Sequence, residues 1–252
     1  MDFVNKDSIV RKIWGNSDTV LFIFAGASAE FALNKAVDWL YFTGRLPADP
    51  LDRLFSTVVY SQQIIFSGEG EALRAIDKIT AIHKGVEQAR GASIPDWAYR
   101  DVLFMLIDYS IRAYELLYNK LSTNEKAEIF DVFYRVGHRM GINGLPQDYA
   151  QWLTMRHYHL LKNFQQSHFT TDLFAQYKKH LGTPRYLILK QVQQLVIPSK
   201  IKTLLGQKPV LWLKPFIFGY KLTRLFRIER VFKNALLPSA YKVQVQQLDM
   251  AL

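Results

Sequence analysis

One long apolar segment limits the folds open to this chain more than any other feature. It follows Ile94-Pro95-Asp96-Trp97 and reads V-L-F-M-L-I-D-Y-S-I-R-A-Y-E-L-L-Y over residues 102–118. A helix that is apolar on most of its circumference belongs inside a protein, so the segment predicts a central buried helix. Asp108 and Arg112 are four residues apart within it, which predicts an intrahelical ion pair at the margin of the core.

The rest of the chain also reads as helix, because strand-like alternation with turn pairs is scarce. Prolines, glycines and a capping box, Ser122-Thr123-Asn124-Glu125, mark the ends of the expected helices. We expect a first helix over residues 17–42, a second from 50 to a break at 67–70, and a third that ends near 91. Further helices are expected from 94, from 122 and from 146, and a last one ends at 182–184.

The chain is expected to form one all-α, multi-helix domain with a basic helical C-terminal extension. Its 252 residues are 49% hydrophobic, which is ample for a packed core. The predicted division is a core of residues 1–182 and an amphipathic extension of residues 183–252 packed on it. Four prolines divide the extension into short helices, namely Pro198, Pro209, Pro215 and Pro238.

The net charge of +10 is unevenly distributed. Residues 173–248 hold 14 Lys and Arg against one acid, Glu229, whereas the rest of the chain holds 18 basic and 21 acidic residues. The basic residues alternate with Leu, Ile, Phe and Trp212, a texture that suits an anionic membrane surface. Ordinary packing with snorkelling lysines explains it equally well. Nucleic acid is not an expected partner.

Several classes of site are excluded by residue types that are missing from the sequence. The chain has no cysteine, which rules out disulfides, zinc–thiolate sites, iron–sulfur clusters and a cysteine nucleophile. It also lacks P-loop, G-x-G-x-x-G, G-x-S-x-G and H-E-x-x-H motifs. The N-terminus does not have the layout of a signal peptide, and the apolar run Val20–Ala29 is too short to cross a bilayer. We therefore expect a cytoplasmic protein that associates peripherally with membranes.

Three residues form the main candidate site. Arg53 and Thr57 are four residues apart in R-L-F-S-T, and His83 lies in A-I-H-K-G-V on the next expected helix. His83 falls on the apolar side of that helix, seven residues after Ile76 and four after Ile79. This pattern is that of a candidate buried metal or haem site. The alternative is structural: a hydrogen-bonded core histidine, an Arg53 ion pair with Asp49 or Asp52, and a Thr that only completes its helix.

Two further positions are weaker candidates. Glu30 lies on the apolar first helix, where a carboxylate must be paired or face a cavity, so a place in a pocket wall is one interpretation. His157 and His159 are two residues apart and point to different faces of a helix, so they do not ligate one metal together.

The ordered set of segments resembles the bacterial oxygenases related to MpaB and to the latex-clearing rubber oxygenases. The resemblance covers most of residues 8–160, with an echo at residues 236–238. It rests on R-L-F-S-T, A-I-H-K-G-V, the long segment A-Y-R-D-V-L-F-M-L-I-D-Y-S-I-R-A-Y-E, S-T-N-E-K, and V-G-H-R-M-G-I-N-G-L-P-Q-D-Y-A-Q-W.

The resemblance implies an all-α fold that holds haem b between its helices. It also implies that His83 is the axial iron ligand and that Arg53 and Thr57 are the other key residues. Arg53 would pair with a haem propionate, because a guanidinium fork suits a carboxylate. The implied reaction is an O₂-dependent oxidation, with cleavage of a carbon–carbon double bond in an apolar, isoprenoid or lipid substrate as the family example.

The sequence departs from the family at two positions. Leu103 stands where many relatives carry a second His, and Ser56 stands where the rubber oxygenases carry a Lys before the motif Thr. These departures are the basis of the alternative hypothesis, a non-enzymatic helical protein that binds a lipid or apolar ligand at the membrane surface.

Overall fold

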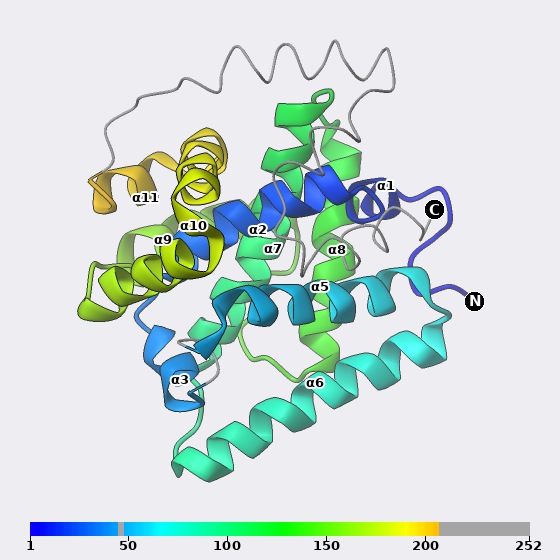
Figure 1. The fold of residues 1–252 in the computed structure, drawn as a ribbon. Helices are drawn as coiled ribbons and strands as arrows, with labels where there is room; N and C mark the ends of the chain where they lie inside the picture. The colour runs from blue at the N-terminus through cyan, green and yellow to red at the C-terminus, as the bar shows by residue number, and fades with distance from the viewer. Residues whose placement is uncertain (45–47, 207–252) are drawn as a thin grey trace.

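Ten α-helices form the part of the chain that the structure describes (Figure 1). The structure is a computed structural model that describes residues 1–44 and 48–206, without the side chains of Arg53 and Leu54. The described residues form no β-strand, only isolated bridges between Asp2 and Gly68 and between Asn34 and Phe164. The prediction of an all-α fold is confirmed. The helices are α1 (Ile9–Trp14), α2 (Ser17–Phe31), α3 (Val37–Phe42), α5 (Pro50–Phe66), α6 (Glu69–Arg90), α7 (Asp96–Leu117), α8 (Thr123–Arg139), α9 (Tyr149–Lys162), α10 (His168–Val196) and α11 (Ser199–Leu204).

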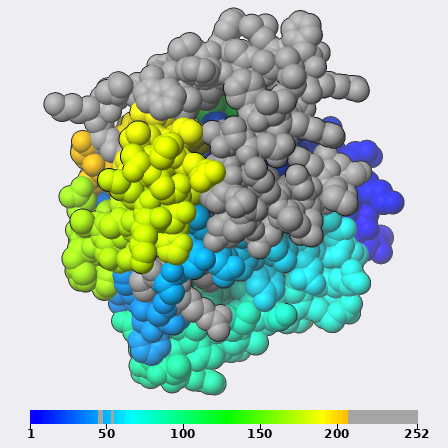
Figure 2. Space-filling view, viewed as in Figure 1, coloured from blue at the N-terminus to red at the C-terminus, as the bar shows by residue number. Residues whose placement is uncertain are grey.

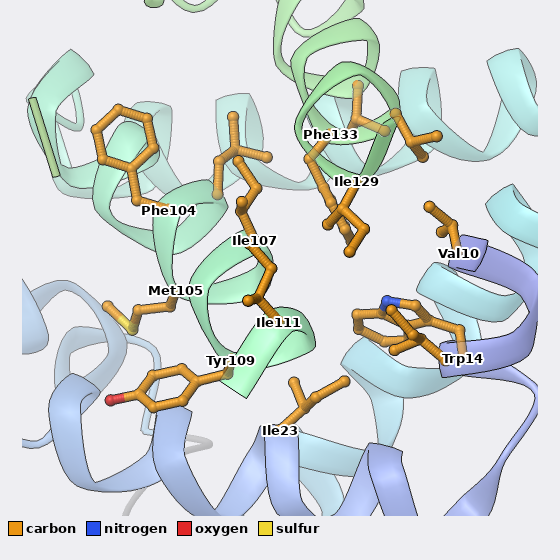
Figure 3. Packing of buried hydrophobic residues seen from close by; sticks show 14 of the residues in the cluster. Val10, Trp14, Ile23, Phe104, Met105, Ile107, Tyr109, Ile111, Ile129 and Phe133 are labelled. Carbon is orange, nitrogen blue, oxygen red and sulfur yellow. The ribbon is translucent and has the colours of Figure 1, made fainter. Parts of the chain in front are cut away.

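The predicted central helix is α7, and it packs against α2 and α8. Figure 3 shows Ile107 and Ile111 of α7 among side chains from α1, α2 and α8, with Trp14 closing one side. Trp14 is fully buried, and its indole N–H donates to Ser110 Oγ at 3.1 Å. Burial of each such large side chain contributes roughly 1.5–3 kcal/mol. The apolar circumference of α7 thus determines the centre of the molecule.

A glycine makes room for α7 to pack closely on α2. The ring of Tyr109 on α7 lies against Gly26 on α2, and a Cβ at Gly26 would be 2.3 Å from Tyr109 Cε1. Tyr109 itself is fully buried. Only a residue without a side chain leaves room for this ring.

Helix ends follow the local sequence signals. Ser122 and Glu125 form the expected capping box at the start of α8, with each side chain bonded to the other's backbone N–H. Asp49 caps α5 by accepting from the N–H groups of Leu51 and Asp52, and Pro50 occupies the first turn. Gly91 ends α6 in the left-handed conformation, at φ 69°.

The expected first helix over residues 17–42 is wrong, because the chain leaves the helical path at Ala32 and re-enters it at Val37. Asn34 causes the break. Its side-chain oxygen accepts from the N–H of Ala36 at 2.8 Å, and its backbone pairs with Phe164 in a β-bridge. The short helix α1, which begins with a Ser8 cap, was not expected.

The helix α10 is bent where the sequence predicted a helix end. Gly182 has φ 71°, and Pro184 follows it, so two helical stretches meet at a kink. Beyond the kink, Val196, Ile197 and Ile201 belong to the main hydrophobic core. Pro209, Pro215 and Pro238 lie outside the described residues, and the division at residue 182 stays a prediction. In the described ranges, no helix combines the length and apolar character that a membrane span needs.

Replacing Gly26 by Ala should destabilise the protein by about 1–3 kcal/mol, because the new methyl group overlaps the Tyr109 ring in a packed core. The matched control is Gly85→Ala in α6, where a Cβ meets no atom within 4 Å. That substitution should stabilise the protein by about 0.5–1 kcal/mol, because alanine favours the helix. Urea unfolding followed by circular dichroism measures both, and equal effects of the two changes would contradict the packing of α2 on α7.

Candidate functional site

The helices α5 and α6 carry the three residues of the main candidate site. They form a hairpin whose arms are joined through Ser67 and Gly68 and spread apart toward the other end (Figure 1). Arg53 lies 14 residues before Ser67, and His83 lies 15 residues after Gly68. At 1.5 Å per residue, both backbones are therefore about 20 Å from the turn. The hairpin places Arg53 and His83 at the same level, whereas Thr57 lies one turn nearer the junction.

His83 is half-buried on the side of α6 that faces α7. Its ring meets the ring of Tyr99, with centroids 5.2 Å apart and planes at 74°. The hydroxyl of Tyr99 donates to Glu87 Oε1 at 3.3 Å, and the N–H of Ile94 donates to the same oxygen at 2.8 Å. Burial, followed by the Glu87 charge, raises the pKa of Tyr99, so its hydroxyl stays protonated. Tyr99 therefore contacts both His83, through its ring, and Glu87, through its hydroxyl, and these two residues are one turn apart on α6.

An open groove of about 320 Å³ runs between α5 and α6. It combines apolar side chains with a carboxylate and an ammonium group, and the ammonium of Lys78 lies 5.8 Å from the centre of the Tyr60 ring. Figure 2 shows the two helices forming one continuous part of the surface in this view. The groove is lined by Asp52, Phe55, Ser56, Val59, Tyr60, Gln63 and Lys78.

The two departures from the family have different surroundings. Ser56 lines the groove, next to Thr57, which is half-buried. Leu103 is buried in the core against α8, and a Cβ added to Gly137 would be 2.5 Å from Leu103 Cδ1. The position of the second family His is thus part of the apolar packing between α7 and α8. The side chain of Arg53 lies outside the described residues, so its expected ion pairs stay predictions.

A buried ionic cluster joins α2, α7 and α9. The guanidinium of Arg156 donates two hydrogen bonds to Glu30, one of them 2.7 Å long, and two to Asp108 Oδ2 at 3.0 and 3.1 Å. The hydroxyl of Tyr109 donates to Glu30 Oε2 at 2.7 Å. Arg112 donates to the other oxygen of Asp108 at 2.6 Å, which confirms the intrahelical pair that the sequence predicted.

The charges in this cluster balance. Burial alone would lower the pKa of Arg156, but the carboxylates of Glu30 and Asp108 raise it, so the guanidinium stays charged. Burial raises the pKa of Tyr109 well above its usual value and keeps it a donor. Because Glu30 is fully buried and paired, this cluster accounts for the carboxylate that the sequence placed on an apolar helix.

A second buried cluster lies around Asp101. One carboxylate oxygen lies 2.6 Å from His159 Nδ1, and the other accepts from the amides of Asn34 and Asn163 at 2.9 Å. His159 is buried, whereas His157 is exposed, so the two histidines point to different faces as expected. The cluster ties the end of α2 and the end of α9 to α7.

The α5–α6 hairpin carries a groove that is open to a small molecule, and neither buried cluster lines it. His83 and Thr57 belong to the same hairpin but are not among the residues that line the groove. The carboxylates of both clusters are hydrogen-bonded inside the core. Within residues 1–44 and 48–206, no group of three or more His, Asp or Glu side chains is placed to hold a metal ion. One protein ligand can hold a haem iron, so a lone imidazole such as that of His83 would be sufficient for it.

Sequence reasoning missed Tyr99, Lys78 and Arg156. Tyr99 and Lys78 lie on amphipathic helices where an aromatic or basic residue is common, so no local signal distinguishes them. Arg156 had one signal: it is the only Lys, Arg, Asp or Glu in α9 before Lys162, and it lies next to apolar residues such as Met155 and Leu160, so it would need partners if buried.

Comparison with known proteins identifies the family. The model of the family described as "ER-bound oxygenase mpaB/B'/Rubber oxygenase, catalytic domain" matches residues 11–213. No curated protein and no solved structure matched the chain. The all-α fold is that of an oxygenase-type catalytic domain, and the chain belongs to the mpaB/rubber oxygenase family.

Replacing Arg156 by Met should destabilise the protein by about 3–5 kcal/mol, because it leaves Glu30 and Asp108 buried without their counter-ion. The control is Arg112→Met, which removes the more exposed partner of the same Asp108 and should cost less than about 1 kcal/mol. Thermal and urea unfolding of both variants test this, and similar losses would show that Arg156 does not hold the cluster.

The stability of the protein should depend on Lys190 in a defined pH range. Burial lowers the pKa of Lys190 to about 8 from 10.5, and its ammonium lies 4.2 Å from the centre of the Phe174 ring. Between pH 8 and 10.5 the unfolded chain holds more protons at this site, so the free energy of unfolding gains a contribution as pH rises. Lys190→Met should be more stable than the natural protein below pH 8, and the difference should shrink above it. A difference that is constant with pH would contradict this assignment.

Proposed function

We propose that this chain is a haem b-dependent oxygenase that acts on an apolar substrate, of isoprenoid or lipid type, with His83 as the axial iron ligand. The observation that carries the proposal is the half-buried imidazole of His83, held by Tyr99 in a chain of an oxygenase family. Family membership gives the oxygenase class. The proposal adds the haem cofactor, its iron ligand and the class of substrate.

The residues around His83 fit a haem in their chemistry. A neutral imidazole is a good iron ligand, and a neighbouring group that fixes its ring improves it. Ile82, the residue before His83, is 44% exposed, so α6 presents apolar surface near the imidazole. Val59 on α5 is 57% exposed, so both arms of the hairpin present apolar surface.

Each candidate residue then has a defined role. Tyr99 limits rotation of the His83 ring, and Glu87 in turn limits movement of Tyr99. Arg53 would bind a propionate through its guanidinium, and Thr57, one turn further along α5, would place a hydroxyl beside the reacting region. When bound, the haem would supply the binding and activation of O₂.

The lining of the groove supports the proposed substrate class. Phe55 and Val59 provide apolar contact, and the polar groups are those of Asp52, Ser56, Tyr60, Gln63 and Lys78. Such a lining orients a mostly apolar molecule that carries one polar end. Oxidative cleavage of a carbon–carbon double bond is the proposed reaction, by analogy with the family.

His83→Ala should abolish haem binding while helicity by circular dichroism is retained, because the side chain supplies the iron ligand. The measurement is the absorption spectrum of haem-supplemented protein, with pyridine haemochrome quantitation. The control is His138→Ala, which removes an exposed histidine from α8 and should leave the haem content unchanged. Full haem retention by His83→Ala would remove this residue from the ligand role.

Thr57→Val should keep the haem and lose O₂ consumption with apolar substrates, because it removes a hydroxyl and preserves the side-chain volume. Oxygen-electrode assays with isoprenoid substrates measure the loss. If the natural protein binds no haem but still binds apolar ligands, the oxygenase proposal fails, and the buried Leu103 favours the non-enzymatic lipid-binding alternative.

A further inference from the structure

The outer face of α9 is unusually apolar for an exposed surface. The described residues contain nine exposed large hydrophobic side chains, and three of them, Leu153, Tyr158 and Leu161, belong to this helix of 14 residues. Their exposed fractions are 48%, 57% and 51%. At about 100° per residue these three lie within one arc of about 140°, an apolar stripe that also includes the exposed Thr154 and His157.

The opposite face of α9 is buried in the core. Trp152, Arg156, His159 and Leu160 are buried, and Arg156 and His159 are fixed by the two clusters on α7. The helix therefore cannot rotate to hide Leu153 and Leu161 without breaking the buried ion pairs. The exposed stripe is a consequence of how α9 is anchored.

The charge near this stripe is mostly positive, although the exposed Asp148 caps the N-terminal end of α9. From Tyr149 to Gly206 the chain has eight Lys and Arg but a single acid, Asp172. Asp172 accepts from the Tyr41 hydroxyl at 2.8 Å, and Arg156 is internally paired. Lys162 directly follows Leu161, and the ammonium of Lys35 donates to the Lys162 carbonyl at 2.6 Å. Two exposed lysines thus lie at the C-terminal end of the apolar stripe.

We propose that the outer face of α9 docks the protein on an anionic lipid bilayer, with Leu153, Tyr158 and Leu161 in the interface and Lys35 and Lys162 at the headgroups. An exposed apolar stripe bordered by cations is the pattern of an interfacial helix. The exposed cations at the C-terminal end of the stripe complement anionic headgroups, whereas a neutral partner would not require them. At 14 residues the helix is about 21 Å long, so it lies in the membrane plane and does not cross it.

This surface is distinct from the α5–α6 hairpin that carries the proposed haem ligand. Figure 2 shows α9 and α10 together on one side of the molecule, with α6 along another. Docking through α9 does not depend on haem, so the two proposals can fail separately.

The test uses the full chain and co-sedimentation with phosphatidylcholine vesicles, with and without phosphatidylserine. We expect binding to the anionic vesicles that weakens as salt is raised. Leu153→Ser combined with Leu161→Ser should weaken this binding at least about tenfold, because two apolar side chains leave the interface. The matched control is Val102→Ser, an exposed apolar residue on α7, which should bind as the natural protein does.

A second variant separates charge from apolar contact. Lys35→Gln with Lys162→Gln should weaken binding to anionic vesicles several-fold and leave any binding to neutral vesicles unchanged. Circular dichroism checks that each variant is folded. The proposal is overturned if the natural protein stays in the supernatant, or if the Leu153/Leu161 variant binds like it, which would assign docking to residues 207–252. The natural protein could instead form a concentration-dependent dimer and bind no vesicles. If the Leu153/Leu161 variant disrupted that dimer, the face would be assigned to a second copy of the chain.

Discussion

The ion cluster around Arg156 is the interaction on which the arrangement of the helices depends. A guanidinium from α9 meets carboxylates from α2 and α7, and both acids are buried with it. Buried ion pairs add little net stability compared with apolar packing, but losing one partner is costly. The cluster therefore acts mainly by specifying which helices meet and in which orientation. Alternative packings of α9 would leave a charge buried without a partner.

Two consequences follow from this anchoring. Arg156 and His159 hold the inner face of α9, which leaves its outer face apolar and exposed. Tyr109, whose ring rests on Gly26, also donates to Glu30, so the tightest apolar contact and the ionic cluster share one residue. The position of α7, in turn, places Tyr99 beside α6. The proposed docking face and the proposed haem ligand therefore both depend on a core that contacts neither membrane nor cofactor.

The two α7-facing histidines illustrate how structure separates similar residues. His159 is buried and bonded to Asp101, whose remaining oxygen is occupied by two amides. His83, on the hairpin that carries the groove, is only half-buried and meets the ring of Tyr99 on α7. A satisfied, enclosed imidazole strengthens the fold, whereas a partly accessible one on an open hairpin suits a ligand role. This contrast supports the choice of His83 over His159 as the functional residue.

The sequence by itself determined the helices and much of the family assignment. Apolar periodicity, Pro50, Gly91 and the Ser122–Glu125 box fix most helix ends through local backbone chemistry, and the ordered motifs indicated the oxygenase family that the comparison confirmed. Only the tertiary structure decided the break at Asn34, because Asn34 pairs with Phe164, 130 residues away in the chain. It also decided the partners of Glu30 and Arg156, which come from helices far apart in sequence, and the contact of Tyr99 with the preceding helix α6. Such contacts depend on how the helices pack, and the local sequence around one residue does not indicate where its partner residue lies.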